Sequence, residues 1–560
     1  MIGRSDNKIN YDLLKFIPPD AANIVEMGCG TGALGLVYKQ KNPMVHYVGV
    51  EGNVQAAAAA TERLDKVVTA NVENVNLADI IGGTKVDCLI YGEVLEHLLD
   101  PWAVLKRHAD CLSEGGQILA CIPNIQHWSI LINLLQGQWT YQDGGLLDKT
   151  HLRFFTLESI RDMFATAGLP VFDIIPQRFE ETAEFKKAQM ILAPAAGALG
   201  LDAKRLAIQT GTLRYIVRAA KQPVEKRILI QAMLGETKVC SRVRISEPHD
   251  FLRTVPGVRT VEQARRADLN LARPGEGKVF IWQRTWPEDF KQQEELIKRG
   301  YLVIAEIDDD PLRWQEYHEK NNFLAFRSCH GIQTSTEPLA EYLRQFNPHV
   351  AVFPNQMAYL PPLRQYDGAN PITLFFGALN REEDWQPLIQ SLNNILEQFA
   401  NKVQVKVIHD KLFFDALSTP YKQFIPFCPY GRYQEILHAS DIAILPLLPT
   451  RFNCMKSDLK FLECAAHGVV ALASPTVYDQ TIQEDVTGML YRNTEEFTSK
   501  LRQLMGDDTL RHSLASNARQ WVASKRMLGQ HYQQRLTWYN QLLDRYAVVN
   551  RGVYKRMGIL

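Results

Sequence analysis

The segment Val25-Glu-Met-Gly-Cys-Gly-Thr-Gly32 decides the fold of the first part of this chain. It follows the apolar run Asn23–Met27 and precedes a stretch with helical periodicity, so it predicts a glycine-rich turn between a strand and a helix. The glycines let the backbone turn tightly and approach a ligand closely. A plain tight turn without a ligand is the alternative. With Ala33 the segment also satisfies the G-x-G-x-x-[G/A] pattern of nicotinamide dinucleotide sites.

Two acidic residues near this turn help to identify the ligand that it would bind. Glu26 stands two positions before the first glycine, where a carboxylate suits a cationic cofactor and repels a pyrophosphate. The next apolar run, Tyr47–Val50, ends at Glu51. A carboxylate at that place can accept hydrogen bonds from both hydroxyls of a ribose. NAD and a cationic nucleoside cofactor both contain a ribose, so Glu51 does not distinguish between them. Glu26 therefore favours a cationic nucleoside cofactor over NAD.

Short apolar runs alternate with helical patterns along the whole chain, which predicts βαβ units and mostly parallel sheets. We therefore expect an α/β protein with several Rossmann-like sheets. The expected parts are a first domain (1–178), a helical linker (179–225), two further α/β domains (226–360 and 361–546) and a tail (547–560).

Composition excludes several classes of function. Lysine and arginine together number 62, as do aspartate and glutamate. The chain therefore lacks the excess of basic residues that is typical of nucleic-acid-binding proteins. The nine cysteines show no zinc or disulfide spacing. Met1–Asn10 lacks the apolar core of a secretory signal, and no run of about 18 apolar residues could span a membrane. We expect a cytoplasmic protein without a transmembrane segment.

The tail Arg545–Leu560 mixes basic and apolar residues. It has two interpretations: a poorly ordered end, or a segment that contacts the inner face of a membrane peripherally.

With Val48-Gly-Val-Glu51, Ala70-Asn-Val-Glu73 and Tyr91-Gly-Glu-Val-Leu-Glu-His97, the glycine-rich segment resembles the class I methyltransferases over residues 20–175. The resemblance implies a seven-stranded sheet and S-adenosylmethionine as cofactor. It places Glu26 near the amino-acid end of the cofactor, Glu51 at its ribose and Asn71 at its adenine. The residues that it implies around the cofactor are Glu26, Gly28, Gly30, Gly32, Glu51, Asn71 and Glu93.

Glu93-Val-Leu-Glu-His97, followed by Asp100-Pro101, is similar to a segment of ubiquinone-type O-methyltransferases. There the acids and the histidine can hold a divalent metal near the acceptor. Three interpretations stay open: a metal centre, His97 as general base, or a plain lining of the cofactor pocket.

Asp148-Lys-Thr-His-Leu-Arg-Phe-Phe-Thr156 resembles a segment of methyltransferases often associated with surface polysaccharide pathways. Polar and apolar residues alternate here, so His151 and Arg153 could share a strand face toward the acceptor. We take His151 as a second catalytic candidate; a satisfied core histidine is the alternative.

Residues 226–545 resemble the GT-B glycosyltransferases, notably the large retaining group called family 4. The resemblance rests on Asp441-Ile-Ala-Ile-Leu-Pro-Leu447, Lys456–Glu463, His467–Ser474 and Thr487-Gly-Met-Leu490. It implies two Rossmann-like domains and a nucleotide-sugar donor, with Glu463 on the donor ribose and Lys456 or Lys460 at the diphosphate. The residues implied at the donor are Gly377, Arg381, Lys456, Lys460 and Glu463.

Two departures from that group concern its chemistry. Met455 stands where a second glutamate is common, and Arg381 is the sole cation near the first strand of the last domain. In the preceding domain Glu306-Ile-Asp-Asp-Asp310 ends a strand, where acids suit a ligand; Asp309 is the catalytic candidate there, and an acidic surface turn is the alternative.

Together the two halves predict a bifunctional carbohydrate-modifying enzyme. One half would methylate a hydroxyl of a glycan or glycolipid, and the other would transfer a sugar, in the synthesis of a cell-surface polysaccharide or glycolipid. Two alternatives stay open: the second half is an inactive glycan-binding module, or the first half is an NAD-dependent sugar oxidoreductase or epimerase.

Overall fold

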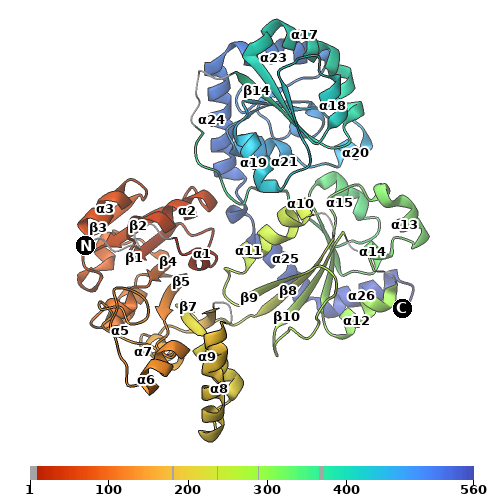
Figure 1. The fold of residues 1–560 in the computed structure, drawn as a ribbon. Coiled ribbons are helices and arrows are strands. Elements are labelled where there is room, and N and C mark those ends of the chain that lie inside the picture. Colours follow the sequence, from red (N-terminus) through yellow and green to blue (C-terminus); the bar gives the residue numbers. More distant parts are fainter. Residues whose placement is uncertain are drawn as a thin grey trace. The chain divides into compact units, whose positions relative to one another are not determined.

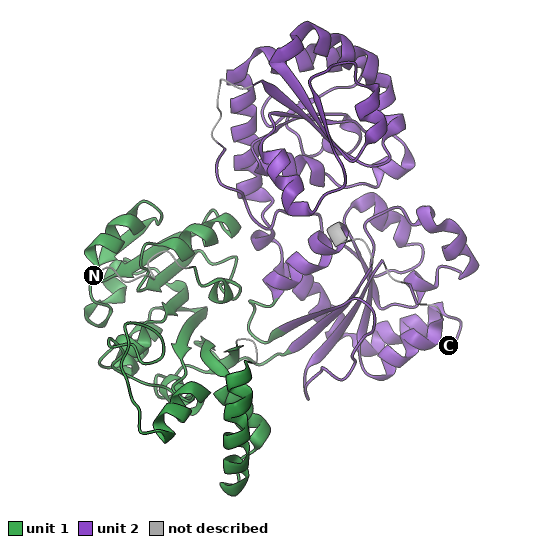
Figure 2. Ribbon diagram, in the orientation of Figure 1, with its two compact units in different colours: residues 1–227, 253–258 green, residues 228–252, 259–560 purple. Residues whose placement is uncertain are grey.

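The computed structural model describes residues 9–178, 182–235, 238–284, 286–287, 289–364 and 371–559 of the chain. Contacts divide the chain into two compact units (Figure 2). Unit 1 comprises residues 1–227 and 253–258, and unit 2 comprises residues 228–252 and 259–560.

Unit 1 contains one seven-stranded sheet with the order β3-β2-β1-β4-β5-β7-β6 (Figure 1). All its strand pairs are parallel except those of β7, which runs antiparallel to β5 and β6. The strands are β1 (Asn23–Met27), β2 (His46–Glu51), β3 (Lys66–Thr69), β4 (Val86–Gly92), β5 (Leu112–Pro123), β6 (Val171–Arg178) and β7 (Thr212–Ala220). The expected α/β class and the seven-stranded Rossmann-like sheet are confirmed.

Helices connect these strands. They are α1 (Tyr11–Leu14), α2 (Ala33–Lys41), α3 (Val54–Thr61), α4 (Leu77–Ile80), α5 (Pro101–Ala109), α6 (Trp128–Leu135), α7 (Leu157–Thr166), α8 (Ala183–Ala198) and α9 (Ala203–Thr210), with short 3-10 turns at Val72–Asn74 and Leu95–His97.

The structure differs from the expected helical linker at 179–225. Within that range α8 and α9 form a helical hairpin, but β7 is a full strand of the sheet. Its apolar residues pack inside the unit, since Ile216, Val217 and Ala219 are completely buried. The sheet is therefore complete only at residue 220. Residues 179–181, where the linker was expected to begin, lie outside the described residues.

Arg218 on β7 explains why residues 253–258 belong to unit 1. Its guanidinium lies between the rings of Phe16 and Phe172, 5.0 and 4.8 Å from their centroids. It donates hydrogen bonds to the carbonyl oxygens of Arg253 (3.0 Å) and Thr254 (2.6 Å). Burial lowers the pKa of Arg218 to about 10, which leaves it charged at neutral pH. A buried cation thus holds this returning segment against the sheet.

Unit 2 contains two six-stranded sheets, with the orders β13-β12-β11-β10-β8-β9 and β16-β15-β14-β17-β18-β19. The strands of the first are β8 (Ile228–Leu234), β9 (Val258–Gln263), β10 (Gly277–Gln283), β11 (Leu302–Glu306), β12 (Gly331–Thr334) and β13 (Val350–Val352). Those of the second are β14 (Ile372–Gly377), β15 (Val403–Ile408), β16 (Lys422–Ile425), β17 (Ile442–Leu445), β18 (Val470–Ala473) and β19 (Met489–Leu490). The pairings within the second sheet are parallel.

The helices of unit 2 accompany these sheets. They are α10 (Lys238–Ser241), α11 (Glu247–Leu252), α12 (Phe290–Lys298), α13 (Gln315–Lys320), α14 (Leu324–Arg327), α15 (Glu337–Leu343), α16 (Glu382–Trp385), α17 (Ile389–Phe399), α18 (Lys411–Ala416), α19 (Tyr430–His438), α20 (Arg451–Cys454), α21 (Leu459–Ala466), α22 (Pro475–Tyr478), α23 (Thr494–Gly506), α24 (Asp508–Lys525), α25 (Gln533–Asp544) and α26 (Tyr546–Arg556).

The chain end is part of the fold, contrary to the interpretation of the tail as a poorly ordered end. Val549 and Val553, one helical turn apart on α26, are buried, and Val553 joins the core of the first sheet of unit 2. Arg556 donates hydrogen bonds to the carbonyl oxygens of Arg327 (3.0 Å) and Cys329 (2.6 Å). The helix uses its apolar side for packing. Among the described residues, no helix has the length and apolarity needed to cross a bilayer.

A buried ion pair joins three segments of unit 2. Arg244 lies in a π-helical turn (Arg242–Ser246) and bonds to Glu306 at the end of β11, with 2.7 Å between Nε and Oε1. The same guanidinium donates to the Phe353 carbonyl (2.6 Å) and to Asn355 Oδ1 (3.0 Å). Both charged side chains are almost fully buried, so each depends on the other.

Replacement of Arg244 by alanine should lower the free energy of unfolding by about 3–5 kcal/mol, because it leaves the Glu306 carboxylate buried without its partner. Urea unfolding of the full chain, followed by tryptophan fluorescence, measures the change. The control is Arg432→Ala, which removes a pair with Glu435 whose members are more than 60% exposed and should cost no more than about 1 kcal/mol. Equal shifts in the two variants would contradict the assignment.

Candidate functional site

The glycine-rich turn lies between β1 and α2, as its sequence predicts. Gly28, Gly30 and Gly32 all have positive φ angles of 70°, 53° and 74°, which other residues rarely adopt. The Gly28 N–H donates to the Val50 carbonyl at 2.7 Å and so ties the turn to β2. A Cβ atom at Gly28 would stand 2.6 Å from Val94 Cγ2. Both conformation and space therefore require glycine at position 28.

Glu26 and Glu51 lie next to this turn, at the ends of neighbouring strands. Glu26 is buried and accepts a hydrogen bond from the Tyr47 hydroxyl at 2.8 Å. Burial raises the pKa of Glu26 to about 8, although the Tyr47 bond works in the opposite direction. The Glu51 carboxylate accepts the N–H groups of Gly30 and Asn53, each at 2.8 Å. The backbone of the turn thus orients the Glu51 side chain.

Asn71 and Glu93 follow β3 and β4 at the same edge of the sheet. The Asn71 side chain accepts the Glu73 N–H at 2.9 Å and caps a 3-10 turn. Glu93 has a φ of 62° and forms an ion pair with Arg214 of β7. Arg214 was not predicted from the sequence, because it lies within residues 179–225, which were expected to form a linker. The edge therefore carries a cation besides the predicted acids.

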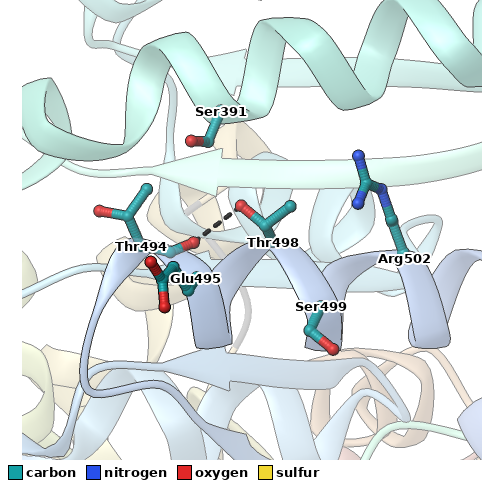
Figure 3. A pocket seen from close by; sticks show the side chains of 6 residues that line it. All are labelled: Ser391, Thr494, Glu495, Thr498, Ser499 and Arg502. Carbon is teal, nitrogen blue, oxygen red and sulfur yellow. Dashed lines mark hydrogen bonds between the residues drawn. The ribbon is translucent and has the colours of Figure 1, made fainter.

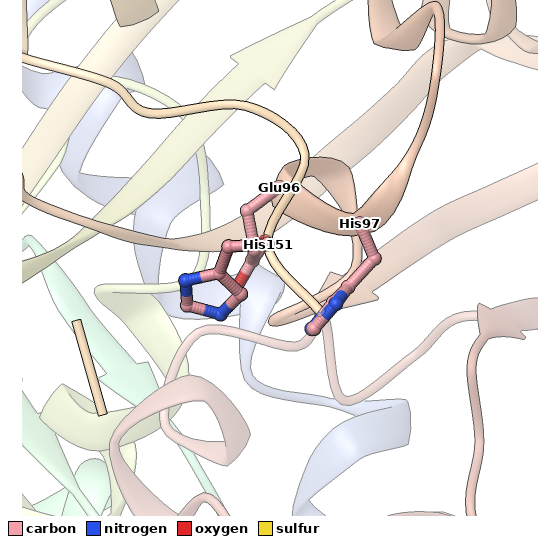
Figure 4. A group of neighbouring side chains, drawn as sticks. All are labelled: Glu96, His97 and His151. Atoms are coloured by element: carbon pink, nitrogen blue, oxygen red, sulfur yellow. The ribbon is translucent and has the colours of Figure 1, made fainter. Parts of the chain in front are cut away.

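Glu96, His97 and His151 come together beside this edge (Figure 4). One ligand atom from each lies within 4.8 Å of the other two. Glu96 is 1% exposed, and neither of its carboxylate oxygens has a hydrogen-bond partner among the described residues. Burial raises its pKa to about 8. A buried carboxyl group without a partner is costly, so its presence requires an explanation.

Backbone contacts fix the orientation of both imidazoles. His97 Nδ1 is 3.1 Å from the Thr150 carbonyl oxygen, and His151 Nδ1 is 3.2 Å from that of Leu146. A carbonyl oxygen can only accept, so each Nδ1 carries the proton and each Nε2 keeps a free lone pair. Burial lowers the pKa of His151, which keeps its ring neutral at neutral pH. Neutral imidazoles are the form that binds metals.

The segment around His151 is a loop and not a strand. The N–H groups of Leu152 and Arg153 both donate to the Glu96 carbonyl, at 2.8 and 3.0 Å. Arg153 also donates to the Leu99 carbonyl at 2.5 Å. The expectation of a shared strand face for His151 and Arg153 was therefore wrong. Backbone hydrogen bonds to the turn at Glu96 bring His151 to the cluster instead.

The predicted donor carboxylate of unit 2 is surrounded by its own neighbours. Glu463 on α21 is 2% exposed and accepts the hydroxyls of Tyr430 (2.8 Å) and Tyr433 (2.9 Å). Lys460 donates to the Tyr433 hydroxyl at 2.8 Å and to Glu463 at 3.2 Å. In this arrangement no oxygen of Glu463 faces open space, so a ribose could reach it only after a tyrosine moves.

Lys456 and Asp309 form an ion pair of 2.7 Å between the two sheets of unit 2. Asp309 is also bonded to Arg284 (2.9 Å) and Arg313 (3.1 Å). Burial alone would raise the pKa of Asp309, but Lys456 and the two arginines hold it below its usual range. Asp309 is therefore the centre of an ion-pair network, and its catalytic role stays a prediction.

Gly377 and Arg381 follow β14 at the edge of the second sheet of unit 2. A Cβ at Gly377 would lie 2.6 Å from the Phe375 ring, so packing alone explains this glycine. Arg381 donates to Asp384 (3.0 Å) and to Asn453 Oδ1 (2.6 Å). Like Lys456, this predicted donor cation has protein partners.

Cavities also lie outside the predicted residues, among them one of about 710 Å³ in unit 2 whose wall includes Phe280, Trp282 and Trp286. Two further cavities are smaller. The first, of about 560 Å³, belongs to unit 1 and includes Trp128, Phe185, Arg178, Lys186 and Gln189 in its wall. The second, of about 410 Å³, lies between α17 and α23 and is lined by Ser391, Thr494, Glu495, Thr498, Ser499 and Arg502 (Figure 3). It includes none of the predicted donor residues.

Two family models match separate parts of this chain. Residues 5–173 match the family model described as a methyltransferase domain, and residues 386–541 match one described as glycosyl transferase-like. The chain combines a methyltransferase domain with a glycosyltransferase domain. Ubiquinone biosynthesis O-methyltransferases from two strains of Cereibacter sphaeroides are 25% and 24% identical over 172 residues, which are 30% of this chain and 67% of theirs.

Some solved structures match parts of this chain at low sequence identity. Sucrose-phosphate synthase from Thermosynechococcus elongatus matches 57% of this chain and 100% of its own, with 11% identity and a TM-score of 0.43. A SAM-dependent methyltransferase from Thermotoga maritima matches 38% of this chain and 86% of its own, with 18% identity and a TM-score of 0.26.

The methyltransferase domain implies S-adenosylmethionine as its cofactor, which gives the raised pKa of Glu26 a measurable consequence. The ammonium group of the cofactor's amino-acid end, which S-adenosylhomocysteine shares, should favour ionised Glu26 if it lies beside that residue. Binding should then release the proton that Glu26 carries below pH 8. The affinity for S-adenosylhomocysteine should therefore rise roughly 20-fold between pH 6.5 and 8.5 relative to the Glu26→Gln variant.

Calorimetric titration of both proteins across this pH range gives the ratio of affinities. The ratio cancels the titration of the ligand's own amino group, which occurs in both proteins. A ratio that does not change with pH would show that Glu26 does not face the amino-acid end of the cofactor.

Proposed function

We propose that this protein is a bifunctional carbohydrate-modifying enzyme, which methylates a glycan hydroxyl with its first half and transfers a sugar with its second. The two family matches within one chain support this proposal most directly. We further propose that both reactions serve a cell-surface polysaccharide or glycolipid and take place in the cytoplasm.

In the methyltransferase half, the turn at Gly28–Gly32 and the adjacent acids fit the cofactor. Around Gly30 the turn is open, since a Cβ there would meet no protein atom within 4 Å, and the buried Glu26 suits the cationic amino-acid end. Glu51 accepts hydrogen bonds in its present state, and it would accept those of the ribose. When bound, S-adenosylmethionine supplies the electrophilic methyl group. Asn71 at the adenine and Glu93 at the edge complete the proposed contacts.

Glu96, His97 and His151 would hold a divalent cation beside this site. The orphaned carboxylate and the two free Nε2 lone pairs carry this part of the proposal. A mixed nitrogen and oxygen set suits Mn²⁺, Fe²⁺ or Zn²⁺. Such a cation would lower the pKa of an acceptor hydroxyl. Without one, His97 is the nearest candidate for a general base.

Mn²⁺ should bind to the full-length protein with one ion per chain, and His151→Ala should weaken this binding at least tenfold, because one of three ligands is lost. The control is His46→Ala, which removes a histidine outside the cluster. Calorimetry in buffers of different ionisation enthalpy should show a proton released from Glu96 at pH 7 but not at pH 9. Equal Mn²⁺ affinity in the wild type and His151→Ala would contradict the centre.

The cavity of unit 1 is our candidate for the acceptor. It opens at the end of β6, because Arg178 lines it, and α6 and α8 contribute Trp128 and Phe185. Aromatic rings can stack on the apolar face of a sugar, and Arg178 and Lys186 can bind a carboxylate or phosphate substituent. An acidic glycan is therefore the acceptor class that this cavity fits.

In the glycosyltransferase half, the proposed donor contacts are Glu463, Lys456, Lys460, Arg381 and the edge at Gly377. Their internal pairing motivates a second candidate function, in which this half binds a glycan without transferring one. Donor binding requires that a diphosphate replace Asp309 at Lys456 and that a ribose replace a tyrosine at Glu463.

Titration with UDP, GDP and dTDP distinguishes these two functions. A working donor site should bind one of them, and Lys456→Ala should weaken that binding at least tenfold through the loss of a phosphate contact. Lys411→Ala, at an exposed lysine of the same unit, should have no effect. If no nucleotide binds while S-adenosylhomocysteine still does, the result contradicts a donor site for these nucleotides and favours the glycan-binding function.

A further inference from the structure

The helical hairpin of α8 and α9 ends in an uncharged, apolar tip. Met190–Leu201 is a run of twelve residues, all of them Met, Ile, Leu, Ala, Pro or Gly. It covers the second half of α8 and the turn before α9. Figure 1 shows the two helices side by side, extending away from the seven-stranded sheet. We refer to Met190–Leu201 as the hairpin tip.

The large side chains of the hairpin tip are exposed. Met190 is 74% exposed, Ile191 56%, Leu199 73% and Leu201 52%. On α8 only Leu192 and Ala196 within this run are buried. Isolated exposed apolar residues are ordinary on a protein surface, but a continuous uncharged run with four large exposed side chains indicates a binding surface.

The shape of the exposed surface favours a lipid over a protein partner. At 100° per residue, the exposed positions of α8 from Met190 to Ala198 cover roughly 200° of the helix circumference. A groove on a protein receives one stripe of a helix, whereas a bilayer surrounds an inserted tip on all its free sides. The turn residues Leu199 and Leu201 extend this surface around the end of the hairpin.

Basic residues flank the tip on both helices. Lys186 and Lys187 precede it on α8, and Lys204 follows it on α9. Arg205 pairs with Glu158, and the nearby acids are Glu184 and Asp202, of which Asp202 caps α9. Lysines at the base of an apolar tip match the anionic headgroups that lie above the acyl region of a membrane.

We propose that the hairpin tip inserts into the interface of an anionic membrane, with the flanking lysines at the headgroups. The helices are too short to cross the bilayer, so the contact is peripheral. This site differs from the one expected at the chain end, and it depends on neither transfer reaction. The acceptor cavity, which shares Phe185, Lys186 and Gln189 of α8, would then lie near the lipid surface.

Vesicle flotation with the full-length protein tests this proposal. The probes are vesicles of phosphatidylcholine alone and of phosphatidylcholine with 30% phosphatidylglycerol, each at low and high salt. The wild type should float with the anionic vesicles, and binding should fall with salt, because screened lysines attract headgroups less. Leu199→Ser/Leu201→Ser should weaken binding roughly tenfold or more, since two exposed leucines no longer enter the lipid.

Leu363→Ser/Leu412→Ser is the matched control, because it replaces two leucines that are 77% and 58% exposed elsewhere in the chain. It should bind vesicles like the wild type. Equal binding by the wild type and Leu199→Ser/Leu201→Ser, or no binding by the wild type, would overturn the proposal. Sedimentation without lipid tests whether a second copy of this chain covers the tip instead. A dimeric wild type together with a monomeric Leu199→Ser/Leu201→Ser variant would make the tip a self-association surface and overturn the membrane proposal.

Discussion

The functional residues of unit 1 depend on one constraint, the parallel arrangement of its central strands. Parallel strands bring their carboxyl ends to a single edge, so residues far apart in sequence become neighbours there. Glu26, Glu51 and Glu93 end or follow β1, β2 and β4. The inserted antiparallel strand β7 begins at that edge and adds Arg214, which pairs with Glu93. The sheet thus brings mutually repelling acidic groups to one edge, where Arg214 neutralises Glu93.

Parallel strands also bring polar residues together in unit 2, but there the predicted site residues are bonded to other protein groups. Asp309 follows β11 at a strand end, and Lys456, which lies between α20 and α21, pairs with it. Glu463 is likewise occupied by Tyr430 and Tyr433. Each of these contacts is a hydrogen bond that a ligand must replace with one of its own, so the net affinity for a donor is smaller than the contacts alone suggest.

Local sequence patterns were sufficient to predict the α/β fold. The arrangement of the site was harder to predict, because it depends on contacts between residues far apart in the sequence. The turn at Gly28–Gly32 follows from its own residues, since positive φ angles need glycine. By contrast, β7 belongs to the sheet only through its pairing with β5 and β6. His151 reaches Glu96 through backbone hydrogen bonds that no sequence spacing encodes. The burial of Val553 likewise depends on a core built by residues more than 200 positions earlier.

The two buried carboxyl groups of unit 1 show why a partner matters more than burial itself. Burial raises the pKa of both Glu26 and Glu96 to about 8. Glu26 accepts a hydrogen bond from the Tyr47 hydroxyl, which reduces the free-energy cost of burying its carboxyl group. Glu96 has no such partner among the described residues, and an apolar residue of similar size would avoid that cost. Stability therefore does not explain Glu96, and this motivates the proposed cation site, in which the two imidazoles beside it would supply the remaining ligands.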